Sequence, residues 1–380
     1  MNKTFGFNAK YLNFVYKNLF LKSPSFFRKA FYRSFSALTR HSLSSSKSPA
    51  RLIFYATNKC NLTCQHCFNA GIKKDCPPGE LSVSEIKKIN FLLPSSVKLI
   101  TITGGEPMLR KDLFEVCEIF LKSRRMSLSI NTNGYFPEET ERLAKKLLSL
   151  FSRNCFNFQV SLDGFRETHN RIRGDPSSFD KSMDTIARLK KLYSKYNNFG
   201  KLSILTTVSK MNIQEVRPFY KFIRENHGLF HKFQMLREGS GNKEFVSRNS
   251  LDPAQVREIV KLLQENLKEG DSDQLFNILE IHTWNSALEI QKNKKRAFEC
   301  AAGRAEGVIY HDGAVGLCEE TAPAGYLRDC AYDFGAIWRS SNADKLREKM
   351  KDCACFNFCH IASSLVFNRD FLKDIFQAGS

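Results

Sequence analysis

Residues Cys60-Asn61-Leu62-Thr63-Cys64-Gln65-His66-Cys67 place three cysteines in one short loop, spaced three and then two residues apart. Thiolate is the soft ligand that iron and zinc accept, and it dominates the ligation of iron–sulfur clusters. A mononuclear zinc site needs a fourth ligand nearby, usually from a second Cys or His pair, and His66 cannot easily supply it from between two of the thiols. The loop therefore favours a [4Fe–4S] cluster with one iron open to an exogenous ligand, and zinc is the alternative.

A second stretch lies some forty residues further on. Residues 97–103 are β-branched and apolar, as in a buried strand, and Gly104-Gly105-Glu106-Pro107 follows. Glycines after a strand allow a ligand to approach the backbone, Pro107 fixes the turn, and Glu106 offers an acceptor. The two stretches together resemble the radical S-adenosylmethionine (SAM) enzymes, in which a C-x3-C-x2-C motif follows the first strand and a G-G-E-P turn follows the second.

This resemblance implies a cofactor and a set of ligands. Cys60, Cys64 and Cys67 would hold the cluster, and SAM would chelate the open iron. One electron, from a donor such as a flavodoxin or ferredoxin, would cleave SAM to methionine and a 5′-deoxyadenosyl radical that abstracts a substrate hydrogen. The positions that match SAM contacts in the family are Gly104, Gly105, Glu106, Pro107, Thr132, Asn133, Ser161 and Arg173. His66 departs from the aromatic residue that the family usually has before the third cysteine, but its flat ring could still face the adenine.

Several of these residues also have ordinary structural explanations. Arg173 matches an arginine that would hold the SAM carboxylate, but it could equally form a surface ion pair. Asn133 could be an Asx-turn residue, and Asp163, a candidate catalytic group, could shape the turn before Gly164. Glu319 and Glu320 are candidate bases, although adjacent carboxylates are more often solvated.

Strands and helices alternate from residue 51 onward, which predicts parallel strands joined by short helical crossovers. The expected fold is α/β: a partial (β/α)6 TIM-like barrel with its chemistry at the strand C-terminal ends. It carries an N-terminal helical extension and a small cysteine-rich C-terminal module. The predicted divisions are an extension over 1–50, the barrel over 51–236, a helical linker over 237–299, the module over 300–360, and a tail over 361–380 that packs on the barrel.

The C-terminal cysteines are grouped as Cys300-x12-Gly313-x4-Cys318 and then Cys353-x-Cys355-x3-Cys359. This resembles the SPASM/twitch extensions of radical SAM enzymes, which carry auxiliary iron–sulfur clusters. The second group is shorter than the full SPASM pattern, so one auxiliary [4Fe–4S] cluster is expected, held by four of the five thiols. A zinc ribbon is the alternative, because four thiolates also suit zinc.

The net charge of +19 is concentrated at the N-terminus. Residues 1–74 contain thirteen Lys and Arg and no Asp or Glu, and two aromatic faces at helical spacing lie within residues 1–50. Basic amphipathic helices of this kind bind anionic membrane surfaces, but they could also dock on the protein itself or form a transit peptide. No run approaches the ~18 apolar residues of a spanning helix. Twelve cysteines in a chain without a signal peptide indicate a cytoplasmic protein, with peripheral membrane association through residues 1–50 as an additional expectation.

The sequence thus predicts an enzyme that abstracts hydrogen from an unidentified substrate, either a peptide or a membrane-associated lipid-type molecule. An RNA-modifying radical SAM enzyme is weaker, since the basic charge lies on helices rather than on aromatic-studded strands, and nucleic acid is an unlikely partner. A non-catalytic iron–sulfur or zinc protein that binds a partner is the remaining alternative, and the G-G-E-P turn argues against it.

Overall fold

The structure is a computed structural model that describes residues 48–70, 79–123, 126–151, 154–196, 200–239, 242–268, 274–368 and 371–372. The extension predicted over residues 1–50 falls almost entirely outside these ranges, and so does the end of the predicted tail. Within the described residues, no helix has the length and apolar content needed to cross a membrane.

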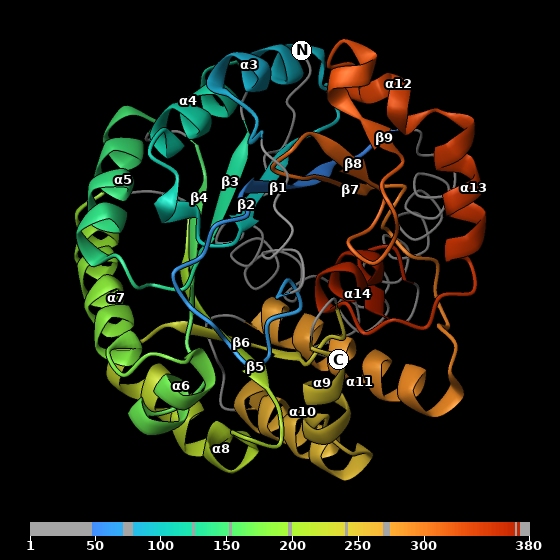
Figure 1. Ribbon diagram of the computed structural model, residues 1–380. Coiled ribbons are helices and arrows are strands. Elements are labelled where there is room, and N and C mark those ends of the chain that lie inside the picture. The colour runs from blue at the N-terminus through green and yellow to red at the C-terminus, as the bar shows by residue number, and fades with distance from the viewer. Residues whose placement is uncertain are drawn as a thin grey trace, which may run out of the picture.

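One nine-stranded sheet organises the molecule, in the order β6-β5-β4-β3-β2-β1-β7-β8-β9. Strands β1 to β6 are parallel neighbours, as the predicted partial barrel requires, and β6 and β9 are its two open edges among the described residues. Figure 1 shows the strands curving around a centre, with helices on the outside. The strands are β1 Arg51–Thr57, β2 Leu99–Gly104, β3 Ser127–Thr132, β4 Phe156–Ser161, β5 Leu202–Val208, β6 Phe230–Met235, β7 Glu306–Ile309, β8 Ala314–Gly316 and β9 Gly325–Tyr326.

The crossover helices cover the outer face of the sheet (Figure 1). The helix α3 begins with the capping box predicted from Ser82 and Glu85, in which each side chain binds the backbone N–H of the other residue. The helices are α3 Val83–Leu92, α4 Leu113–Ser123, α5 Pro137–Leu150, α6 Arg166–Arg173, α7 Ser178–Lys195, α8 Ile213–Lys221, α9 Lys243–Asn249, α10 Pro253–Lys268, α11 Gln274–Asn293, α12 Phe334–Trp338, α13 Ser341–Met350 and α14 Phe358–Leu365, with 3₁₀ turns at Pro107–Leu109 and Leu327–Cys330.

Two helical segments differ from the sequence expectation. The polar composition of residues 239–249 predicts a loop, but Lys243–Asn249 form α9, a helix without a fully buried residue and therefore without an apolar pattern to reveal it. The pattern over residues 213–226 predicts a single regular helix, but the segment contains Pro218, and its last turn, Phe222–Asn226, is π-helical. Proline lacks a backbone N–H, so the i→i−4 ladder is interrupted there.

Two apolar cores support the sheet. The main core lies between the strands and helices α3 to α7, and it extends to β8 and α12. A second core joins α8, α10, α11 and α14, where Trp284 packs edge-on against Phe358 with ring centroids 4.8 Å apart. The chain after residue 360 therefore packs against α10 and α11, at the β6 end of the sheet.

The C-terminal strands continue the barrel sheet. Strand β7 pairs in parallel with the free side of β1, with Arg51 opposite Glu306, and β8 and β9 follow in antiparallel pairing. The Arg51 guanidinium and the Glu306 carboxylate form an ion pair of 2.8 Å across this junction. The cysteine-rich module is thus hydrogen-bonded directly to the strand that leads into the first cysteine loop.

Candidate active site

A cavity of about 210 Å³ lies at the C-terminal ends of the strands. The first cysteine loop, the turn after β2 and the ends of β3 and β4 form one side of it. Residues that follow β6 and β8, together with the start of α14, form the other side. Its lining includes most of the predicted site: Cys60, Cys64, His66, Cys67, Gly104, Gly105, Glu106, Thr132, Asn133, Ser161, Arg173, Glu319 and Cys359.

The first cysteine loop is held by two segments that the sequence did not identify. The backbone N–H of Gln65 donates to the carbonyl of Ile172 in α6, at 3.0 Å. On the other side, the Asn242 amide donates to the carbonyl of His66 at 3.2 Å. Helix α6 and the start of α9 therefore fix the loop so that its three free thiols line the cavity. Three thiols on one loop, open to a cavity, are a donor set that fits a cluster with one open iron.

The described residues contain no group of three or more His, Cys, Asp or Glu side chains that converges closely enough to hold a single metal ion. A [4Fe–4S] cluster places its cysteine ligands around a cube of four irons, so these thiols need not meet at one point. The arrangement of the first loop is therefore compatible with the predicted cluster.

The two glycines of the G-G-E-P turn are also required for a reason that the sequence does not show. A Cβ on Gly104 would lie 2.2 Å from the carbonyl oxygen of Thr57, and one on Gly105 would lie 1.9 Å from that of Lys59. Gly104 also has φ +136°, which disfavours other residues. The backbone that approaches these glycines most closely is thus the segment before Cys60. The turn packs against the cysteine loop itself, and it is tied there by hydrogen bonds from Gly105 N to Thr57 O and from Glu106 N to Lys59 O, both 2.8 Å.

Glu106 connects the ends of β2 and β3. Its carboxylate accepts hydrogen bonds from the Thr132 hydroxyl at 2.8 Å, the Asn133 backbone N–H at 2.7 Å and the Met108 N–H at 3.1 Å. Burial nevertheless raises the pKa of Glu106 to about 7, because these donors only partly replace water. A cationic group in the cavity would favour its charged form. Pro107 begins the 3₁₀ turn that follows and is not among the cavity-lining residues.

Asn133 has the Asx-turn role that the sequence left open, and it also lines the cavity. Its side-chain oxygen accepts from the N–H of Tyr135 at 2.9 Å, which is an Asx-turn contact. Its amide donates to the Asn61 side chain at 2.9 Å, so it also connects the end of β3 to the cysteine loop while lining the cavity.

Arg173 and Asp163 form a buried ion pair beside the cluster loop. The Arg173 Nε lies 2.7 Å from Asp163 Oδ2, and its Nη1 lies 3.7 Å from the Cys64 sulfur. Asp163 is 0% exposed and does not line the cavity. Burial opposes its charge, but Arg173 and neighbouring histidines outweigh burial and lower the pKa of Asp163. Asp163 therefore positions Arg173 and does not reach the cavity in this arrangement. Arg173 itself is buried, so it is not the surface ion-pair residue that was the alternative.

His66 lines the cavity with its Nε2 atom 3.8 Å from Asp163 Oδ2. Burial lowers the pKa of His66 to about 4, with Asp163 opposing and Arg173 reinforcing the effect. The ring is therefore neutral near pH 7, as a surface for stacking requires.

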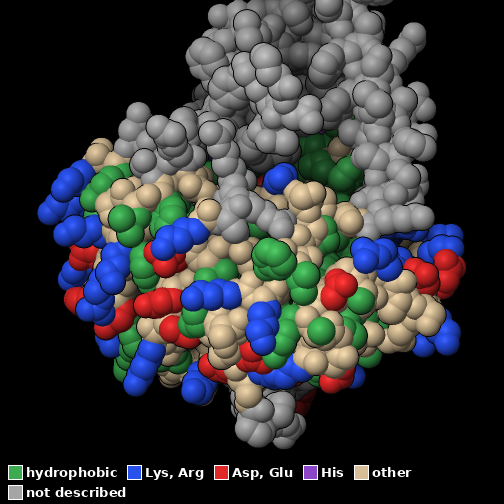
Figure 2. All heavy atoms as spheres, turned by 90° about the horizontal axis from the view of Figure 1, so that it is seen from above, with side chains coloured by type: hydrophobic (Ala, Val, Ile, Leu, Met, Phe, Trp, Pro, Cys, Tyr) green, Lys and Arg blue, Asp and Glu red, His purple; other side chains and the backbone are tan. Residues whose placement is uncertain are grey.

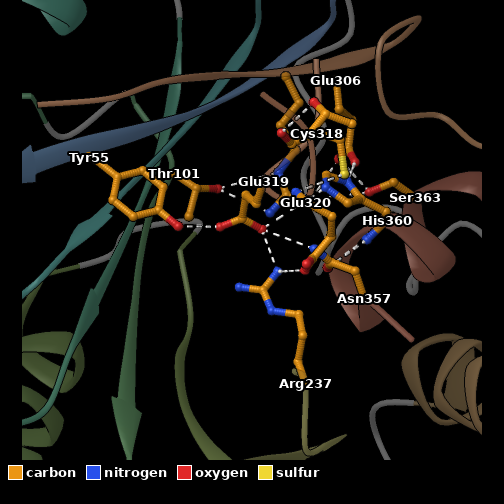
Figure 3. Close-up of polar contacts among 12 residues, drawn as sticks. Tyr55, Thr101, Arg237, Glu306, Cys318, Glu319, Glu320, Asn357, His360 and Ser363 are labelled. Atoms are coloured by element: carbon orange, nitrogen blue, oxygen red, sulfur yellow. Dashed lines mark hydrogen bonds and ion pairs between the residues drawn. The ribbon is translucent and has the colours of Figure 1, made fainter. Parts of the chain in front are cut away.

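Glu319 lies on the opposite side of the cavity in a network shown in Figure 3. Its carboxylate accepts from Arg237 Nη1 at 2.8 Å, from the Asn357 amide at 3.0 Å and from the Tyr55 hydroxyl. Burial opposes ionisation, but Arg237 outweighs it and holds the pKa of Glu319 far below the ordinary range. Such a carboxylate is a poor proton acceptor near pH 7, so this arrangement does not favour Glu319 as a base.

Glu320 has a raised pKa, caused first by burial and then by the neighbouring Glu319 charge, with Arg237 opposing them. It is not among the cavity-lining residues. Of the two carboxylates proposed as bases, Glu319 lines the cavity but its low pKa makes it a poor proton acceptor. Glu320 has the more suitable pKa but does not line the cavity.

Arg237 was missed by the sequence analysis, although it follows directly after β6, at the strand end where barrel chemistry is expected. Its guanidinium stacks 3.5 Å from the ring centroid of Phe68, next to Cys67, while it binds Glu319. Arg237 thus connects the cysteine loop to the C-terminal module across the cavity. Tyr55 and Asn357 were also missed, because nothing in their local sequence indicates that they meet Glu319.

The C-terminal thiols separate into two groups. Cys355 lies within electrostatic reach of both Cys353 and Cys318. Cys359 lines the central cavity instead, and its electrostatic neighbours there are Arg51 and Lys232. Cys300 packs against the main apolar core.

Comparisons with known proteins agree with this geometry. Residues 54–223 match the model of the radical SAM superfamily. The AdoMet-dependent heme synthase of Methanosarcina barkeri is 27% identical over 328 residues, covering 81% of this chain and 86% of that protein. The mycofactocin maturase MftC of Mycobacterium tuberculosis is 25% identical over 325 residues, covering 83% and 77%.

Among solved structures, Streptococcus suis SuiB bound to its precursor peptide SuiA matches with a TM-score of 0.59 and 16% identity, covering 83% of this chain and 70% of that one. At this identity the match shows a shared fold. The cysteine loop, the G-G-E-P turn and strands β2 to β5 lie within residues 54–223, so this part of the chain is a radical SAM domain, and the chain is an enzyme.

Proposed function

We propose that this enzyme cleaves SAM reductively and abstracts hydrogen from a peptide substrate bound in the cavity at the strand ends. The observation that carries the proposal is the packing of the G-G-E-P turn against the backbone of residues 57–59, beside a cavity that is lined by the three thiols of the first loop and by the predicted SAM contacts other than Pro107. When bound, the cluster and SAM supply a radical able to break an unactivated C–H bond.

The residues of the chain would bind and orient SAM. The Glu106 carboxylate suits the SAM ammonium group, since a neighbouring cation offsets the cost of its buried charge. Ser161 and Arg173, on the same side of the cavity, suit the SAM carboxylate, with Arg173 held in place by Asp163. His66 provides a neutral ring for the adenine.

The C-terminal module would hold a single auxiliary [4Fe–4S] cluster, which Cys318, Cys353 and Cys355 support by their proximity. When bound, that cluster would supply an electron acceptor for the substrate after hydrogen abstraction. Glu319 and Arg237, which form an ion pair of 2.8 Å, both line the cavity.

The size of the cavity favours a peptide over a large planar ligand. Sites for drug-sized molecules typically measure about 300–1,000 Å³, whereas this cavity measures about 210 Å³ and must also hold SAM. A peptide can present a single side chain to such a space. A tetrapyrrole is the second candidate, because the heme synthase relative aligns over most of its length. A lipid-type substrate depends on residues 1–50, which lie outside the described residues.

Nucleic acid remains the weakest substrate class. On the face shown in Figure 2, Lys and Arg side chains are interspersed with Asp and Glu, and the coloured atoms there form no continuous basic surface. Recognition of a phosphate backbone requires such a surface.

The test is anaerobic reconstitution with iron and sulfide, followed by turnover with SAM and dithionite. Formation of 5′-deoxyadenosine that is lost on Cys64→Ala substitution supports the proposal, and its absence from the reconstituted enzyme refutes it. Peptide, lipid and porphyrin fractions from deuterated cells are then supplied separately. Deuterium in 5′-deoxyadenosine is expected with the peptide fraction. Transfer from the porphyrin or lipid fraction alone would contradict the peptide assignment and leave the SAM chemistry intact.

A further inference from the structure

A buried histidine lies beside the C-terminal thiols. His360, in the first turn of α14, is 1% exposed. Its Nδ1 lies 2.8 Å from Glu306 Oε2 at the start of β7. Figure 3 shows Glu306, Cys318 and His360 close to one another, next to Glu319. Three segments far apart in the sequence therefore converge on one imidazole.

The second nitrogen of this ring is in an unusual position. Nε2 is buried and has no hydrogen-bond partner that satisfies strict geometry, and the nearest carboxylate oxygen, Glu319 Oε2, is 4.0 Å away. A buried ring nitrogen without a partner costs free energy unless a ligand satisfies it. Because Nδ1 is directed at the Glu306 carboxylate, Nε2 is the ring nitrogen that would bind a ligand once the ring is neutral.

This arrangement has the form of a metal-ligating histidine. Such a residue almost always donates its other ring N–H to a carboxylate, which fixes the tautomer and the orientation of the ring. Glu306 is itself fixed by Arg51 at 2.8 Å and by the Ser363 hydroxyl. The carboxylate is therefore held in place independently of His360, as an orienting group must be.

The neighbouring residues identify the other ligands. Cys318 lies beside His360 (Figure 3), Cys355 lies within electrostatic reach of Cys318, and Cys353 lies within electrostatic reach of His360. Cys359 precedes His360 in α14 but faces the central cavity, since successive residues of a helix point about 100° apart. Cys300 packs against the main apolar core.

We propose that His360 Nε2 is the fourth protein ligand of the auxiliary iron–sulfur centre, alongside Cys318, Cys353 and Cys355. The inference deepens the proposed function and rests on the presence of that centre. Binding of the cluster displaces any proton on Nε2 and on the Cys318 sulfur, because metal ligands must be deprotonated. Replacement of a thiolate by a neutral imidazole also makes the cluster less negative, which raises its reduction potential.

The experiment compares three single variants of the full-length chain, each in a background where Cys60, Cys64 and Cys67 are all alanine. In that background only the auxiliary centre can bind iron, and about four irons per chain are expected for one [4Fe–4S] cluster. His360→Ala should lower this iron content and change the EPR spectrum of the reduced cluster. Cys300→Ala and Cys359→Ala should keep both iron content and spectrum.

Two further measurements separate a ligand from a merely structural residue. Pulsed EPR of the reduced cluster should show strong coupling to one nitrogen, which shifts when the protein is labelled with ¹⁵N-histidine and disappears in His360→Cys. The His360→Cys variant should regain the full iron content at a lower reduction potential. Far-UV circular dichroism identifies any variant that fails to fold. If a His360 variant fails to fold, the nitrogen coupling measured in the protein that retains His360 decides whether this residue is a ligand.

Two results would overturn the inference. One is full retention of iron in His360→Ala together with loss in Cys300→Ala or Cys359→Ala, and the other is absence of strong nitrogen coupling. If the background protein instead binds no iron, the auxiliary centre is absent and the proposed function fails at that point. This result differs from that of a centre ligated only by cysteines, which would bind iron but show no strong nitrogen coupling.

Discussion

The buried Asp163–Arg173 ion pair beside the first cysteine loop permits a quantitative test of how much it contributes to the free energy of unfolding. Asp163 is fully buried, and the side chain of Arg173 is 9% exposed. At 2.7 Å and an effective dielectric constant of about 20, Coulomb's law gives an attraction of about 6 kcal/mol. Much of this offsets desolvation, and the removal of one partner from a buried pair typically costs about 3–5 kcal/mol, because the other charge is left uncompensated.

Asp163→Asn and Arg173→Met should therefore each lower the free energy of unfolding by several kcal/mol, measured by anaerobic urea unfolding of the apoprotein. The double variant leaves neither charge buried, so its loss should be smaller than the sum of the two single losses by about 2–3 kcal/mol. Arg166→Met is a matched control on the same helix, since its partner Asp180 is exposed and the pair should contribute little. Additive losses within about 0.5 kcal/mol would show that the two side chains do not depend on each other.

Three further predictions concern other parts of the chain. Gly105→Ala would place its Cβ 1.9 Å from the carbonyl oxygen of Lys59, so this variant should reduce iron binding by the first loop. Gly228→Ala is the control, because that glycine also has a positive φ, 64°, but its Cβ would meet no atom within 4 Å, and iron binding should be unchanged. Equal iron content in the two variants would refute the packing argument. The pKa of Glu106 rises from 4.5 to about 7 on folding, so its contribution to stability is complete below pH 4.5 and is lost as the pH rises through 7. Across that range the stability of the wild type should fall relative to Glu106→Gln by up to about 3 kcal/mol, and parallel pH profiles would contradict the burial effect. Deletion of residues 1–49 should abolish salt-sensitive co-sedimentation with anionic liposomes, and equal sedimentation of both forms would favour docking of that segment on the protein itself.

The sequence predicted those parts of the site that depend on local chain geometry. The three thiols of the first loop lie within eight residues, and the G-G-E-P turn follows a strand whose composition identifies it, so both could be placed before any tertiary contact was known. The parallel order of β1 to β6 followed in the same way from the short crossovers. The glycines were recognised from the sequence, but only the fold shows that the backbone before Cys60 also lies against them.

Contacts that depend on register could not be predicted. The Glu306–His360 hydrogen bond requires β7 to pair with β1, and Arg237 reaches Glu319 only because residues after β6 and β8 face the same cavity. Sequence spacing also could not reveal that Cys359 and its neighbour His360 face different sites, because that depends on the rotation of a short helix relative to the sheet.

The pairing of β7 with β1 has a consequence for how the chain matures during synthesis. Arg51 and Glu306 are 255 positions apart, so at about 5–20 residues per second the ribosome needs roughly 10–50 seconds to produce the partner of a strand that has already emerged. During that interval one side of β1 presents unpaired backbone groups and buried-type side chains, which is the kind of edge that attracts other chains. A nascent chain stalled in this interval is expected to require a chaperone, and iron delivered before β7 arrives would meet a cysteine loop whose supporting strand is only half paired.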